Sequence, residues 1–173
     1  QLDALRVAYR RRLLQIAALD LADGLDVAAV SAELADLAAA TLDAGLAIAR
    51  AGLPPDATQC RLAVIGMGKC GGRELNYVSD VDVIFVGGAA DEGEASLSDS
   101  RAIDIATRLA VQTMRGVSSH EIEPPLWEVD PNLRPEGKQG ALVRTLDSHV
   151  AYYERWAKSW EFQALLKARP LAG

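Results

Sequence analysis

Cysteine and histidine are scarce in this 173-residue chain, which has two residues of each kind. Cys60 and Cys70 form no C-x-x-C pair and belong to no cysteine–histidine cluster, which excludes a disulfide framework and a zinc site of the usual spacing. Thiols without a disulfide pattern are typical of a reducing compartment, so we expect a cytoplasmic protein.

The sequence also lacks a long hydrophobic run and an excess of positive charge. Its apolar stretches are far shorter than the roughly 20 residues that cross a bilayer, and its first residues show no signal-peptide pattern. With 18 basic and 24 acidic residues the net charge is −6, which argues against binding to nucleic acid or to a membrane surface. Half of the residues are apolar, which predicts a folded chain with a buried core.

Two helical segments open the chain. Apolar residues recur at three- and four-residue steps from residue 2 to about 24, and again from Asp26, a candidate N-cap, to about residue 51. This pattern predicts an antiparallel helical pair over residues 1–52. A proline pair then ends helicity, and we expect a second domain over residues 58–173. Because the chain opens within a helix, we expect it to be a fragment of a longer protein.

Short strands and helices alternate in the second domain. Apolar and β-branched runs predict strands at residues 61–65, 81–86, 126–130 and 141–145. Helical patterns predict a short helix at 73–76, a helix of about four turns that begins at Ser98 or Asp99, and a last helix from 147 to 168 that Pro170 ends. This order, helices and then β-α-β-α-β-β-α, predicts an α+β fold.

A glycine-rich turn follows the first predicted strand. Gly66, Gly68 and Gly71 match G-x-G-x-x-G, but the next strand begins too soon for a dinucleotide-binding βαβ unit. No acidic residue comes just after that strand, and the acidic residues precede it instead. A Walker A loop is excluded because Lys69 is followed by cysteine rather than serine or threonine. The pair Gly71-Gly72 instead lets backbone amides approach a phosphate closely.

Three aspartates lie at strand edges. Asp80 and Asp82 project to the same side, because side chains two apart on a strand share a face, and together they can hold one or two cations. An isolated D-x-D is more often a turn residue beside a strand-edge charge. Here the glycine pair upstream and a third carboxylate, Asp130, favour a metal site, because three carboxylates on adjacent strands suit two divalent ions that hold a nucleotide phosphate.

Longer blocks extend these motifs: GMGKCGGRELNYVSDVDVIF at residues 66–85, EVDPNLRPEGKQG at 128–140 and WEFQALLKAR at 160–169. They resemble the glutamine synthetase adenylyltransferases, also called glutamate-ammonia-ligase adenylyltransferases, of the nucleotidyltransferase superfamily. The resemblance implies that residues 58–173 form a polymerase-beta-like catalytic domain, a mixed sheet flanked by helices. It also implies Mg²⁺-dependent AMP transfer to or from a tyrosine of glutamine synthetase, and control of nitrogen assimilation through a PII-type signalling protein.

The resemblance further implies that this chain is one of two tandem modules. The glycine block and the basic Arg10-Arg11-Arg12 helix look more like the N-terminal, AMP-removing copy, whereas the last block is similar to both copies. We therefore expect transfer of AMP from an adenylylated tyrosine to phosphate, giving ADP. The alternatives are the adenylylating copy, which uses ATP, a non-catalytic nucleotide-sensing module, and a nucleotidyltransferase that acts on an antibiotic or on RNA.

Residue roles follow from the same resemblance. Asp80, Asp82 and Asp130 are expected to hold Mg²⁺, and in AMP addition Asp130 would also act as the base for the tyrosine hydroxyl. The candidate nucleotide- and phosphate-binding residues are Gly71, Gly72, Lys69, Arg73, Ser79, Arg134 and Lys138. Two positions depart from the family pattern: Cys70 replaces the usual leucine, and Asn132 replaces an arginine, which leaves Arg134, Lys138 or Lys69 to supply positive charge.

Several other residues are expected to have structural roles. Trp156 and Trp160 lie four residues apart on the last predicted helix, which predicts a shared stripe in the core. Lys167 and Arg169 either reach the phosphates or complement the dipole at the end of that helix. His120 and His149 are expected to be surface or structural residues, and residues 10–12 a solvated face.

Overall fold

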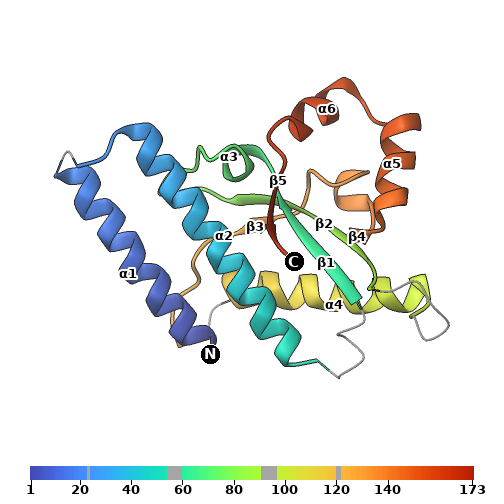
Figure 1. Cartoon of the computed structure of the whole chain (residues 1–173), viewed down its shortest axis with the longest axis horizontal. Coiled ribbons are helices and arrows are strands. Elements are labelled where there is room, and N and C mark those ends of the chain that lie inside the picture. Colours follow the sequence, from blue (N-terminus) through green and yellow to red (C-terminus); the bar gives the residue numbers. More distant parts are fainter. Residues whose placement is uncertain (23, 54–59, 91–96, 120–121) are drawn as a thin grey trace.

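Two long helices lead into the fold. The computed structural model describes residues 1–22, 24–53, 60–90, 97–119 and 122–173. Helices α1 (Leu2–Leu21) and α2 (Val27–Ala51) lie side by side and run in opposite directions (Figure 1), as predicted. The predicted N-cap is confirmed, because Asp26 Oδ1 accepts a hydrogen bond from Ala29 N at 2.7 Å.

A mixed sheet forms the centre of the molecule, and within the described residues it has five strands. The strand β1 (Cys60–Gly66) lies between β2 (Val81–Ala89) and β5 (Arg169–Ala172) and is antiparallel to both. Two short strands, β3 (Val129–Asp130) and β4 (Val143–Arg144), pair in parallel with β2. The predicted α+β class is therefore confirmed.

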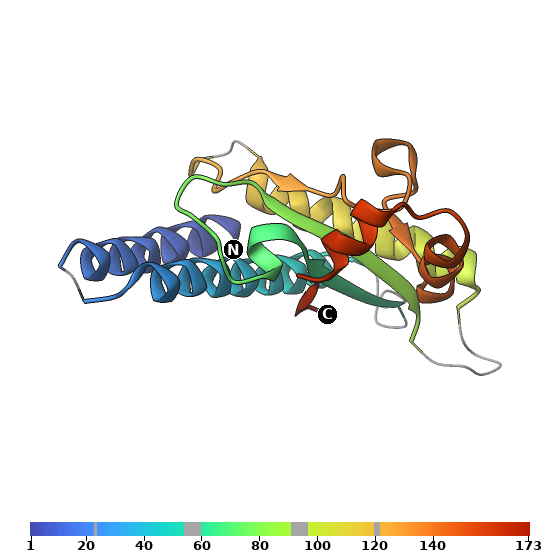
Figure 2. The same ribbon diagram turned by 90° about the horizontal axis from the view of Figure 1, so that it is seen from above.

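Helices pack against one face of this sheet. The helix α4 (Asp99–Ser118) contacts β1 and β2, and α2 contacts both α4 and β5 (Figure 2). Alternate residues of β2, Val81, Val83 and Phe85, are buried in one hydrophobic cluster with Leu42 of α2 and Leu109 of α4. The helical lead-in and the sheet thus share a core.

The opposite face of β2 looks toward shorter elements. These are α3 (Gly68–Gly71), the 3-10 turn η2 (Gly137–Gln139), α5 (Leu146–Arg155) and α6 (Ser159–Leu165). Residues of α5 and α6 line a cavity together with Ile84 and Val86 of β2. None of the helices in the described ranges is long and apolar enough to cross a membrane.

The structure corrects several predicted elements. The short helix lies at 68–71, inside the glycine turn, and residues 73–76 contain no helix. The strands predicted at 126–130 and 141–145 have only two residues each. The reason is that β3 pairs only with Val81 and Asp82 of β2, and β4 only with Phe85 and Val86. In contrast, β2 continues through Ala89, and the cap Ser98 of α4 accepts from Arg101 N at 3.3 Å, as predicted.

The last predicted helix is wrong as a single element. The chain leaves helical geometry between α5 and α6, and Lys158 N donates to Glu161 Oε2 at 2.8 Å to start the second helix. Residues 169–172 then form β5 rather than a helix end, and Pro170 lies within this strand. Proline is tolerated there because β5 is an edge strand, where a missing N–H donor breaks no ladder on the open side.

The tryptophans expected in the core are at the surface. Trp156 and Trp160 are 73% and 51% exposed, because the break between α5 and α6 removes them from a common stripe. His149 is buried and structural, whereas His120 lies outside the described residues. On α1, Arg12 is exposed and pairs with a glutamate of α2, while Arg10 is half-buried against Glu123 and Pro124.

Candidate active site

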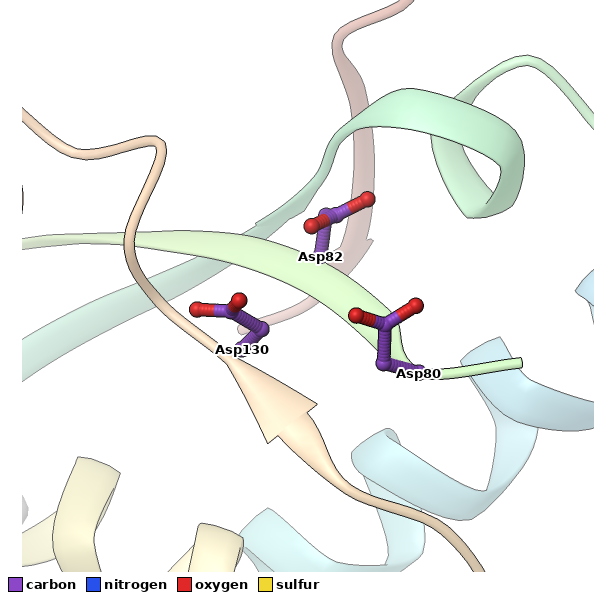
Figure 3. A group of neighbouring side chains, drawn as sticks. All are labelled: Asp80, Asp82 and Asp130. Atoms are coloured by element: carbon purple, nitrogen blue, oxygen red, sulfur yellow. The ribbon is translucent and has the colours of Figure 1, made fainter.

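The three predicted aspartates meet at the edge of the sheet. Asp80, Asp82 and Asp130 each offer a carboxylate oxygen within 4.8 Å of the others (Figure 3). Asp82 on β2 is in register with Asp130 on β3, so their side chains project from the same face, and Asp80 precedes Asp82 by two residues. Figure 3 shows all three carboxylates on one side of the sheet.

The glycine turn leaves room for Asp82. Gly68 has a φ of +50°, and a Cβ atom there would lie 2.5 Å from Asp82 Oδ2. Met67 N also donates to Asp82 O at 2.9 Å, which ties the turn to the start of β2. A residue with a side chain at position 68 would therefore displace the carboxylate.

The aspartate cluster concentrates negative charge. Burial raises the pKa of Asp82, and the neighbouring Asp80 and Asp130 raise this pKa further, while Lys69 lowers it. Such mutual repulsion is relieved when a cation lies between the carboxylates. A donor set made only of carboxylate oxygens suits a hard divalent cation such as Mg²⁺, so the residues present fit the metal that the sequence predicted.

Asp130 is held in place by its own loop. Its Oδ1 atom accepts a hydrogen bond from Asn132 N at 2.7 Å. Because the donor is a backbone amide, any residue other than proline at position 132 can fix this carboxylate. The departure of Asn132 from the family pattern therefore leaves the orientation of Asp130 intact.

The strand β5 holds the glycine turn from the other side. Arg169 donates to Gly71 O at 3.2 Å and to Cys70 O at 3.1 Å, and its guanidinium lies 3.6 Å from Asp36 Oδ1. A Cβ atom at Gly71 would lie 2.0 Å from Lys167 O, so glycine is required for this close approach. Arg169 thus supports the turn.

Side chains near the glycine turn have partners within the protein. Lys69 Nζ donates to Asn76 Oδ1 at 3.3 Å, and Ser79 Oγ donates to Asp80 O at 2.8 Å. Arg73 pairs with Asp36 at 2.5 Å, and Lys167 pairs with Glu74 at 2.5 Å. Lys69 is the candidate cation whose charge acts on Asp82.

The candidates of the second block lie on the loop between β3 and β4. Arg134 donates to three carbonyl oxygens of this loop, those of Pro131, Lys138 and Gly140, and the exposed side chain of Lys138 belongs to η2. Burial lowers the pKa of Arg134, an effect that Asp130 opposes and Arg144 reinforces. Arg134 therefore lies near both Asp130 and Arg144.

One arginine near the site, Arg144, was not among the residues predicted from the sequence. Arg144 on β4 is in register with Val86, forms an ion pair with Glu136, and lies 5.9 Å from the ring centre of Tyr152. Arg169 was expected to reach the phosphates or to complement a helix dipole, but it lies on β5 and donates to Gly71 O and Cys70 O instead. Cys70, in contrast, carries a buried thiol whose pKa burial raises to about 11, which keeps it protonated and unreactive.

Comparisons with known proteins place these residues in context. The family model described as glutamate-ammonia ligase adenylyltransferase matches residues 1–173. The bifunctional glutamine synthetase adenylyltransferase/adenylyl-removing enzyme of Streptomyces coelicolor is 66% identical over 169 residues, which cover 98% of this chain and 17% of that protein. The proteins of the same name in Leifsonia xyli and Mycolicibacterium smegmatis are 61% and 57% identical, over 98% of this chain and 18% and 16% of theirs. The chain thus spans about a sixth of the length of these relatives.

Proposed function

The chain belongs to the glutamate-ammonia ligase adenylyltransferase family, and on this premise we propose that its three aspartates bind Mg²⁺ and transfer AMP at a tyrosine of glutamine synthetase. The observation that carries the proposal is the convergence of Asp80, Asp82 and Asp130 within 4.8 Å, beside a glycine turn at the edge of a mixed sheet. The relatives are named for adding and for removing adenylyl groups. Residues 58–173 would form the catalytic domain, and residues 1–52 its helical lead-in.

The direction that we assign is removal of AMP. Phosphate attacks the α-phosphorus of the adenylylated tyrosine, the bond from phosphorus to the phenolic oxygen breaks, and ADP and the tyrosine are released. The amino-acid sequence of the glycine block, residues 66–85, supports this direction, because it is more similar to the AMP-removing copy. The attacking phosphate is already an anion, so no strong base is required. Bound Mg²⁺ would neutralise charge on the phosphate oxygens during the displacement.

The protein's own residues would then act mainly by position. Asp82 on β2 and Asp80 just before that strand would hold the cation, and Asp130, oriented by Asn132 N, would complete the set from β3. We assign the phosphate contacts to Lys69 and to the backbone of Gly71 and Gly72. In the adding direction Asp130 would accept the proton of the tyrosine hydroxyl.

Further phosphate-binding residues and a regulatory partner belong to the same proposal. Arg73, Ser79, Arg134 and Lys138 remain predicted phosphate ligands, and each of the first three would have to exchange an internal hydrogen bond for a phosphate oxygen. Control by a PII-type signalling protein rests on the family resemblance.

The test is ADP release by the full-length polypeptide that carries this chain. The protein is mixed with Mg²⁺, phosphate and adenylylated glutamine synthetase, and an otherwise identical Asp82→Asn variant is the control. Release by the wild type alone supports the proposal, whereas equal release by the variant rejects the metal site. AMP incorporation from ATP that is lost in the variant, without ADP release, would assign this module to addition. Mg²⁺-dependent nucleotide binding without either turnover would favour the sensing module.

A further inference from the structure

An apolar cavity of about 620 Å³ lies between β2 and the pair α5–α6. We call it the α5–α6 cavity. Its floor comes from Ile84 and Val86 of β2, and its walls include His149 and Tyr153 of α5 and Phe162 of α6. The proposed catalytic residues do not include any of these side chains, so the cavity has no assigned role.

The cavity continues the face of β2 that carries the metal site. Asp82, Ile84 and Val86 alternate along the strand and therefore project from one face. At a rise of about 3.3 Å per residue, Ile84 lies about 7 Å and Val86 about 13 Å from Asp82 along the strand. A nucleoside whose α-phosphate is held at Asp82 can therefore lie along β2 with its base in the cavity.

The walls of the cavity suit a flat aromatic ligand. The rings of Tyr153 and Phe162 lie 5.6 Å apart at an angle of 63°, and the remaining wall is mostly aliphatic. Aromatic and aliphatic surfaces of this kind bury the faces of a planar ring, while a few polar groups select its edge.

The polar groups of the lining favour one base. The Nδ1 atom of His149 lies 3.0 Å from Thr145 O, and because a carbonyl oxygen only accepts, Nδ1 must carry the proton. Burial lowers the pKa of His149, so the ring is neutral and its Nε2 atom is an acceptor. The carboxylate of Glu154 also accepts, and the Tyr153 hydroxyl can donate or accept. Adenine presents an amino donor at N6, where guanine presents a carbonyl acceptor.

We propose that the α5–α6 cavity binds the adenine ring of the adenylyl group and selects adenine over guanine. This inference rests on the proposed function, because it takes the α-phosphate to be held at the aspartates.

Nucleotide binding to the chain tests the inference without the protein substrate. Isothermal titration in the presence of Mg²⁺ compares ADP with GDP, and we expect ADP to bind at least about tenfold more tightly. Val86→Trp, which fills the cavity from its floor, is expected to weaken ADP binding by about tenfold or more. Val27→Trp is the matched control, because it adds the same bulk at an exposed position of α2. It should leave the affinity for ADP unchanged.

A second variant covers the case in which Val86→Trp fails to fold. Phe162→Ala removes an aromatic ring from the wall of the cavity. Because Phe162 is already 48% exposed, the change should leave the fold intact, and it should also weaken ADP binding several-fold. Circular dichroism of each variant checks its fold. Equal affinity for ADP and GDP, or folded cavity variants that bind ADP like the wild type, would overturn the inference.

The Asp82→Asn variant separates this inference from the proposed function. Mg²⁺-dependent ADP binding that is lost in Asp82→Asn but kept in the cavity variants rejects the adenine site alone. Absence of Mg²⁺-dependent ADP binding by the wild type rejects both. Cavity variants that keep ADP affinity but lose the binding of a tyrosine-containing peptide would assign the cavity to the acceptor segment, which also overturns the inference.

Discussion

Single glycines set the position of the catalytic carboxylates. Gly68 combines a φ of +50° with a contact that a Cβ atom would make at 2.5 Å to Asp82 Oδ2. In contrast, a Cβ atom at Gly88, on the same sheet, would meet nothing within 4 Å. The two positions therefore separate the geometry of the site from the general effect of adding a methyl group.

We predict that Gly68→Ala lowers the turnover of AMP transfer by about a hundredfold, because a small displacement of a reacting group has an effect of this size. Alanine is strained in the left-handed backbone conformation of position 68, so the variant should also have a free energy of unfolding that is lower by about 1 kcal/mol or more. Steady-state kinetics and urea denaturation measure the two effects. Gly88→Ala is the control, and normal turnover in Gly68→Ala would contradict the account of Asp82.

The raised pKa of Asp82 links the metal site to stability. Burial, Asp80 and Asp130 all favour the protonated form, so the folded state binds this proton more firmly than the unfolded state does. Stability from this group is therefore present at low pH and is lost as the pH rises from the unfolded pKa to the raised folded pKa.

We predict that, without Mg²⁺ at neutral pH, Asp82→Asn is at least as stable as the wild type. The gain in the free energy of unfolding should stay below about 1 kcal/mol, because the carboxylate is only partly buried and solvent screens it. Added Mg²⁺ should stabilise the wild type alone. Thermal unfolding at pH 4 and pH 7, with and without Mg²⁺, checks this. Equal stabilisation of both proteins by Mg²⁺ would show that Asp82 is not a ligand of the metal.

Elements show where local chemistry is sufficient. Asp26 was predicted to cap α2 from residue type and position alone, and the structure confirms the hydrogen bond to Ala29 N. We predict that Asp26→Ala lowers the free energy of unfolding by about 1 kcal/mol, whereas Asp26→Asn retains most of the stability. Urea denaturation of both variants measures this, and equal stability of the alanine variant would show that the cap contributes nothing.

The end of α5 shows where local chemistry fails. The periodicity continues through Trp156 and Trp160, but the chain bends and the buried Glu161 accepts hydrogen bonds from Lys158 N and the Tyr152 hydroxyl. Lysine is not a usual N-cap residue, so neighbouring residues in the sequence give no sign of this break. The bend depends on contacts that exist only once α5 and α6 are packed.

We predict that Trp160→Ala changes the free energy of unfolding by less than about 0.5 kcal/mol, because about half of this residue is exposed and it lies outside the core. Leu42→Ala, in the core of α2, should cost about 3 kcal/mol and serves as the comparison. Chemical denaturation measures the free energy of unfolding of both variants. A loss similar to that of Leu42→Ala would show that Trp160 is part of the core.

At the scale of the whole molecule, the lead-in and the sheet are held together by buried contacts. Arg6 on α1 is fully buried and donates to the carbonyl oxygens of Gly116, Ser119 and Glu123, at or beyond the end of α4. Leu42 of α2 belongs to the same hydrophobic cluster as Phe85 of β2. The predicted boundary after residue 52 thus separates two segments that share a core.

We predict that residues 58–173 alone do not fold, because removal of α1 and α2 exposes the faces of α4 and β5 that α2 covers. Circular dichroism with a urea titration checks this on the truncated chain beside the full chain. A cooperative transition in the truncated chain would show that the lead-in is a separate domain.

The sequence alone determined the features that depend on neighbours along the chain. Helix caps, the glycine turn, the main strands and the shared face of Asp80 and Asp82 follow from backbone preferences and from the alternation of side chains. Only the tertiary structure decided which distant segments meet. The register of β3 brings Asp130 beside Asp82, and β5 brings Arg169 to the glycine turn. These contacts join residues that lie about 50 to 100 positions apart, so they depend on how the sheet pairs and packs rather than on any local pattern.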